Sequence, residues 1–119
     1  MLRAVAVASI LACSCGASFA QCAVEPWSIP YFGSNTSTAM SAGSGQPCRI
    51  YAGAGGTNIV NSVAVTASPR HGTASVSDTV VTYRSRPGFT GADSFTFQVS
   101  GSGPGGSGTS SVQVSVTVQ

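Results

Sequence analysis

The C-terminal part of the chain alternates between apolar and small polar residues. Valine occupies every second position from Val112 to Val118, and Gln, Ser and Thr lie between the valines. Side chains two positions apart share one face of a β-strand, whereas an α-helix repeats every 3.6 residues. The pattern therefore predicts a strand with one buried face and one face in water, and it does not fit an amphipathic helix.

The same period of two recurs along most of the chain. Phe95, Phe97 and Val99 alternate with polar residues, and so do Val81 and Tyr83. Turn-forming Gly, Pro, Ser and Asp residues interrupt these runs at intervals of about ten residues, a spacing typical of β-sandwiches. The sequence predicts an all-β fold, an antiparallel β-sandwich.

Two expectations concern the C-terminal segments. The glycine-rich run 101–108 is expected to be a flexible connection that holds no strand. The last strand, 110–119, carries no charged residue. If it lies at an edge of the sandwich, it is expected to support weak self-association with a second chain.

The first twenty residues predict export. Arg3 precedes an apolar run at 4–13, and the segment 18–20 has small residues at the two positions that a signal peptidase reads. This is the pattern of a secretory signal peptide at 1–20, and it places the chain outside the cell or in the periplasm. The apolar run is shorter than the roughly 20 residues that a membrane span needs. Lipid anchoring at Cys13 stays open, because 10–13 loosely resembles a lipobox.

Removal of the signal peptide leaves two cysteines, Cys22 and Cys48. An even pair in an exported chain predicts a disulfide. A zinc site is disfavoured, because no histidine lies near and the short paired spacing of such sites is missing. The segment 21–45 contains several prolines and glycines. It is interpreted as an irregular N-terminal arm that the disulfide pins to a sandwich domain at 46–119.

Composition disfavours several classes of function. Only 7% of residues are charged, the net charge is +2, and the arginines are scattered with no lysine among them. This does not predict a basic surface for nucleic acid. The single histidine, His71, has no partners in a pattern typical of a catalytic triad. Asp78 and Asp93 fall in predicted turns, where a pair of catalytic carboxylates is not expected. The chain is therefore expected not to be an enzyme.

The stretch 68–100 resembles the bacterial immunoglobulin-like or cadherin-like modules that are repeated in bacterial surface adhesins. The resemblance is carried by PRHGT at 69–73, VTY at 81–83 and GFTGADSF at 88–95. It implies an immunoglobulin-like sandwich and a role in binding or structure at the cell surface. It does not extend to the N-terminal arm.

Six residues of this stretch are assigned structural roles in turns. Glycine permits backbone angles that other residues resist, a phenylalanine can cover the end of the core, and aspartate accepts hydrogen bonds from backbone N–H groups. The six residues are His71, Gly72, Gly88, Phe89, Gly91 and Asp93. Calcium, which some cadherin-like relatives bind, is the alternative role for Asp93. Calcium takes six to eight oxygen ligands and the chain has only three acids, so no cofactor or metal is expected.

Three aromatic residues of the arm, Trp27, Tyr31 and Phe32, are the candidate binding residues. They could form a patch for a protein or a carbohydrate of the cell envelope or matrix. The need of a small domain for every large apolar group in its core favours the other interpretation, that they cover the core. The resulting hypothesis is a small exported non-enzymatic module that binds, adheres or has a structural role at the cell surface or in the periplasm. The alternative is a secreted inhibitor or effector that blocks a partner protein through this arm.

Overall fold

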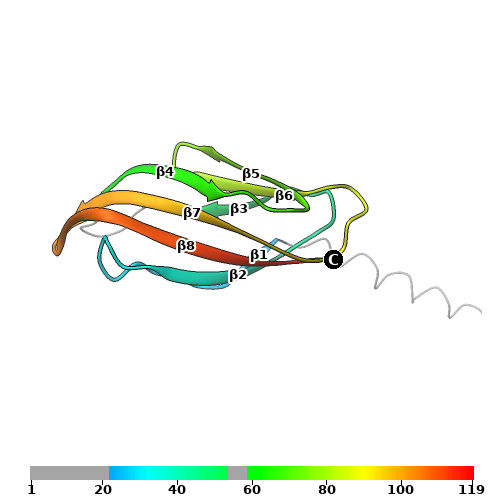
Figure 1. Cartoon of the computed structure of the whole chain (residues 1–119), viewed down its shortest axis with the longest axis horizontal. Coiled ribbons are helices and arrows are strands. Elements are labelled where there is room, and N and C mark those ends of the chain that lie inside the picture. The colour runs from blue at the N-terminus through cyan, green and yellow to red at the C-terminus, as the bar shows by residue number, and fades with distance from the viewer. Residues whose placement is uncertain (1–21, 54–58) are drawn as a thin grey trace, which may run out of the picture.

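The computed structural model describes residues 22–53 and 59–119, and these residues form two packed sheets (Figure 1). The larger sheet has the order β1 (Ala23–Val24), β2 (Thr36–Ala42), β8 (Gly106–Val118), β7 (Gly91–Gly103), β4 (Ile59–Ala67). The smaller sheet has the order β3 (Cys48–Tyr51), β6 (Val80–Ser85), β5 (Gly72–Ser77). The predicted immunoglobulin-like β-sandwich is confirmed. The predicted signal peptide at 1–20 lies outside the described residues.

The core lies between the two sheets and consists of the alternating residues that the sequence predicts to face inward. Every second residue is buried from Phe95 to Gly101 in β7 and from Ser110 to Val118 in β8, and the smaller sheet contributes Val81 and Tyr83 from β6. The ring of Tyr83 stacks on that of Phe95 across the core, with centroids 5.7 Å apart. The largest buried side chains of the larger sheet are Phe95, Phe97, Val99, Val112, Val114 and Val116.

The last strand lies inside the larger sheet. β8 pairs antiparallel with β7 and parallel with β2, where Thr36 lies opposite Val112 and Ala42 opposite Val118. The prediction of self-association through an edge strand at 110–119 is therefore wrong, because neighbouring strands already occupy both sides of β8.

The predicted boundary between an irregular arm and the sandwich also needs correction. β2 lies within the segment 21–45, yet it is the strand that covers β8. Its inward residues Thr38, Met40 and Ala42 are buried. The irregular part is therefore the shorter stretch between β1 and β2, and β2 belongs to the sandwich.

The glycine-rich run 101–108 forms the end of a long hairpin. β7 and β8 pair in unbroken register from Gly91 opposite Val118 to Gly103 opposite Gly106. The expectation of a flexible connection without strand structure is wrong, because the run is paired as part of β7 and β8. Gly101 lacks a side chain, which allows other segments to approach this part of the strand closely. A Cβ at this position would collide with the carbonyl oxygen of Ile59 and lie 2.7 Å from Cζ of Phe32.

Replacing Gly101 with alanine is expected to destabilise the domain by about 2 kcal/mol, because the added methyl group forces backbone atoms apart. Gly105→Ala is the matched control, since its Cβ would meet only Cβ of Tyr31 at an ordinary 3.5 Å. Urea unfolding of both variants measures the difference. Equal stability of the two variants would contradict the close approach at Gly101.

Candidate functional site

The carboxylate of Asp93, near the start of β7, joins two other segments to this strand. Its Oδ1 accepts the backbone N–H of Arg70 at 3.0 Å and that of Ser94 at 2.9 Å. Its Oδ2 accepts the backbone N–H of His71 at 3.1 Å and the hydroxyl of Tyr83 at 2.8 Å. The prediction that Asp93 accepts backbone hydrogen bonds in a corner is confirmed. The hydroxyl of Tyr83 is a partner that the sequence did not reveal.

These contacts set the protonation states of both side chains. Burial by itself would raise the pKa of Asp93, but the hydrogen bonds from Tyr83 and from the backbone of Ser94, Arg70 and His71 outweigh it and hold the pKa below its usual value. Burial, with the hydrogen bond to Asp93 and its negative charge, raises the pKa of Tyr83. At neutral pH the corner therefore pairs an ionised aspartate with a neutral, donating tyrosine.

Other residues of the predicted turn set close this end of the sandwich. The rings of His71 and Phe89 stack with centroids 4.2 Å apart, and Phe89 packs against the core. Gly88 and Gly91 have φ angles of 88° and 130°, where a side chain would be strained. A Cβ at Gly72 would collide with the backbone of the paired strand β6. These contacts and angles support the structural roles predicted for all five residues.

His71 and Asp93 are not arranged as in a catalytic triad. The contact between them is made by the backbone N–H of His71, while Nδ1 of its ring lies 3.3 Å from the guanidinium of Arg86. Each carboxylate oxygen of Asp93 already accepts two hydrogen bonds from the protein. A calcium ion bound there would have to displace some of these donors. Within 22–53 and 59–119 no three His, Cys, Asp or Glu side chains gather as a metal site would require. That the chain binds no calcium stays a prediction.

The structure separates the three candidate aromatic residues. Trp27 is half-buried and meets Phe97 of the core edge to face, with ring centroids 5.8 Å apart. Phe32 is half-buried as well and packs against the core. Only Tyr31 is well exposed, at 59%. Trp27 and Phe32 therefore pack against the core, and Tyr31 and Phe32 line a hollow beside the hairpin end 103–106 that does not include Trp27.

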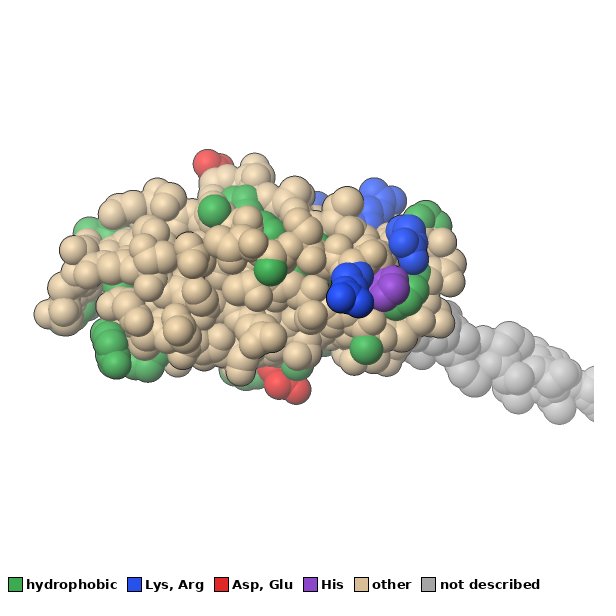
Figure 2. All heavy atoms as spheres, in the orientation of Figure 1, with side chains coloured by type: hydrophobic (Ala, Val, Ile, Leu, Met, Phe, Trp, Pro, Cys, Tyr) green, Lys and Arg blue, Asp and Glu red, His purple; other side chains and the backbone are tan. Residues whose placement is uncertain are grey.

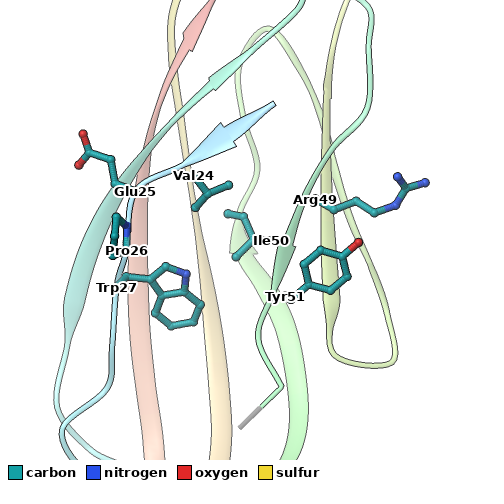
Figure 3. Close-up of a pocket in the computed structure, with 7 residues that line it drawn as sticks. All are labelled: Val24, Glu25, Pro26, Trp27, Arg49, Ile50 and Tyr51. Carbon is teal, nitrogen blue, oxygen red and sulfur yellow. The ribbon is translucent and has the colours of Figure 1, made fainter. Parts of the chain in front are cut away.

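A groove opens where the N-terminal segment faces the edge strand β3 (Figure 3). Trp27 stands on one wall, and Ile50 of β3 points toward Val24 from the other, while Arg49 and Tyr51 point to the outer side of β3 and Glu25 points away on the opposite side. Tyr51 is 70% exposed. The residues that line the groove are Val24, Glu25, Pro26, Trp27, Arg49, Ile50 and Tyr51. Of these residues the sequence singles out only Trp27, because strand alternation places Tyr51 on an outer face but does not show that a groove lies beside it.

The predicted disulfide holds the two walls of this groove together. Cys22 precedes β1 and Cys48 begins β3, and the bond joins them with a Cα–Cα distance of 5.2 Å. The prediction of a Cys22–Cys48 bridge is confirmed. Such bonds persist in compartments that are not reducing.

Two facing sheets around a core of alternating residues, closed by a glycine-rich corner, define an immunoglobulin-like sandwich. The family model described as bacterial Ig domain matches residues 34–117, and the chain belongs to this family. The match begins just before β2, which agrees with its place in the sandwich. Domains of this family are generally non-catalytic structural or adhesion modules, typically extracellular or at the cell surface. No curated protein matches the chain. None of the described residues form a helix with the length and apolar character of a membrane span.

Proposed function

We propose that the chain is an exported, non-enzymatic binding module that contacts a protein of the cell envelope through the groove between the N-terminal segment and β3. The observation that carries this proposal is the exposed Tyr51 beside an open groove that has Trp27 on its other wall, where β3 forms the edge of its sheet among the described residues. The signal-peptide pattern at 1–20 and the disulfide support export to the periplasm or the cell surface.

The residue types of the groove favour a protein partner. Tyrosine, tryptophan and arginine are the residues that most often dominate protein interfaces, and all three occur here. Among residues 22–53 and 59–119, β3 pairs only with β6, so the backbone groups along its other side can add an extended segment of a partner. Glu25 and Arg49 flank the groove with opposite charges, which would fix the direction of such a segment.

The groove is preorganised for binding. The disulfide fixes the start of both walls, and Trp27 is held against Phe97. Binding therefore needs little ordering of the walls, which reduces its entropic cost. The alternative function, an inhibitor or effector that blocks a partner through the aromatic arm, would use either Trp27 in this groove or the hollow that Tyr31 and Phe32 line.

Tyr51→Ala is expected to weaken binding of the partner at least about tenfold, since truncating a central aromatic residue removes most of its contact area. Tyr31→Ala is the matched control, because Tyr31 is an exposed tyrosine outside the groove. The immobilised exported protein and both variants are incubated with envelope proteins, and the captured protein is then purified and titrated against each. Loss of affinity only with Tyr51→Ala supports the proposal.

Three outcomes of this experiment would contradict the proposal. The first is equal binding by both variants, and the second is binding only to glycans on an array. The third is that no captured protein binds the Tyr51→Ala variant more weakly than it binds the wild-type chain. Circular dichroism of each variant checks that the sheets are intact, because Tyr51 makes little contact with the core.

A further inference from the structure

Three of the five arginines meet at one end of the sandwich. Arg70 precedes β5, Arg84 lies near the end of β6, and Arg86 follows this strand. Arg84 and Arg86 are two residues apart in the sequence, and Arg70 joins them because β5 and β6 pair so that these strand ends coincide, with Thr73 opposite Arg84. All three line one hollow, named here the arginine hollow, together with Gly72, Thr73, Ser85 and Pro87. Figure 2 shows the basic side chains gathered toward the end that carries the histidine.

The acids of the described chain leave this positive charge largely uncompensated. Asp93 is nearby, but both of its oxygens already accept two hydrogen bonds each. Asp78 lies in the turn at the other end of the β5–β6 hairpin, about 20 Å away at 3.3 Å per residue. Glu25 belongs to the groove beside β3. Three guanidinium groups line one hollow and the single nearby acid is Asp93, so the net charge at this end is positive and attracts anions.

Two of these guanidinium groups are already oriented by the protein. Nε of Arg84 donates to the carbonyl oxygen of Gly45 at 2.8 Å, and a terminal nitrogen of Arg86 lies 3.3 Å from Nδ1 of His71. Both guanidinium groups keep further N–H donors, and two parallel N–H groups of a guanidinium can bind the two oxygens of a carboxylate. Side chains that are fixed in advance lose less entropy when a ligand binds.

The lining of the arginine hollow indicates the class of ligand. It contains the exposed hydroxyl of Thr73 but no aromatic or long aliphatic side chain that would favour an apolar anchor of a protein partner, and the buried Ser85 hydroxyl is already bonded to Gly45 and Arg86. A ligand that combines carboxylates with many hydroxyls fits this lining best. We propose that the arginine hollow binds the carboxylates of an acidic polysaccharide, independently of the groove beside β3.

Polygalacturonate is the probe for this site, titrated by calorimetry against the exported protein at low salt and at 150 mM salt. The double variant Arg70→Gln/Arg86→Gln is expected to weaken binding at least about tenfold, because each arginine supplies a charge-assisted pair. Arg49→Gln is the control for net charge, since Arg49 lies outside the arginine hollow. It is expected to change the affinity less than about twofold. Thermal unfolding checks that the variants are folded.

Several outcomes would overturn the inference. They are no binding of polygalacturonate, equal weakening by Arg49→Gln, or equal binding of methyl-esterified polygalacturonate, which lacks the charges. Equal binding of polyglutamate or of DNA would also overturn it, because it would show that charge alone is recognised. Binding that depends on Arg70 and Arg86 and survives Tyr51→Ala would show that this site is separate from the groove.

Discussion

Asp93→Ala is expected to lower the free energy of unfolding by about 3 kcal/mol, which corresponds to a fall in Tm of about 15 °C for a domain of this size. The variant leaves four donors without their acceptor: the backbone N–H groups of Arg70, His71 and Ser94 and the hydroxyl of Tyr83. Tyr83 is completely buried, so its hydroxyl cannot turn freely to water. The corner would open and release the turn before β5.

Asp78→Asn is the matched control for the loss of an acid. Asp78 is exposed in a turn and has a φ of 55°, a conformation that asparagine also tolerates. The control should change the stability by less than about 0.5 kcal/mol. Chemical denaturation measures both variants. If Asp93→Ala is as stable as Asp78→Asn, the corner does not stabilise the fold as its hydrogen bonds indicate.

The same carboxylate predicts how stability depends on pH. The pKa of Asp93 is lower in the folded chain than its ordinary value, so the folded state favours the ionised form. Its contribution is therefore complete above the unfolded pKa of about 3.9 and disappears as the pH falls through the lower folded pKa. The wild-type domain should lose this stability on acidification, while Asp93→Ala lacks this contribution at every pH. If the wild-type domain and Asp93→Ala lose the same stability on acidification, the pH dependence does not come from Asp93.

Removal of the disulfide is expected to have an effect of similar size. Cys22→Ser/Cys48→Ser should reduce the free energy of unfolding by about 3–4 kcal/mol, because a bridge across 26 residues restricts the unfolded chain. The residues around Trp27 should become the most mobile part of the domain, since β1 is only two residues long. Hydrogen exchange of the amides in β1 and β3 locates the change.

Reduction of the wild-type protein provides the comparison for this double variant. It should reproduce the lower stability, and the intact mass should rise by two hydrogens. The same mass measurement on exported protein reads the start of the mature chain, predicted at Gln21. A double variant that unfolds at the same denaturant concentration as the oxidised protein would show that the bridge does not stabilise the domain.

Sequence periodicity predicts which residues face the core, but it does not predict the order of the strands. Val112 to Val118 had to be buried on one face, and this follows from the alternation alone. Whether this last strand has a neighbour on both sides depends on β2, and the small residues of β2 give a weak strand signal. The glycines at 101–108 were misinterpreted for a related reason, because their role depends on Phe32 and Ile59, which are distant in sequence.

The corner could be predicted in part and the binding surfaces much less. Turn chemistry indicates that Asp93 accepts backbone hydrogen bonds, but its bond to Tyr83 requires knowing that the two sheets meet there. Arg84 and Arg86 are close in the sequence, but only the pairing of β5 with β6 brings Arg70 to them. Likewise, Tyr51 follows the alternation of a strand, which says nothing about the open groove beside it.

The parallel pairing of β2 with β8 has a consequence for how the chain reaches its native state. Thr36 and Val112 are neighbours in the sheet although most of the chain separates them. Ribosomes make β2 long before β8, whereas the β5–β6 and β7–β8 hairpins can form from adjacent residues. Joining β2 to β8 is therefore a late step with a high entropic cost. A nascent chain that still lacks β8 holds β2 with a bare hydrogen-bonding edge, open to strands of other unfinished chains.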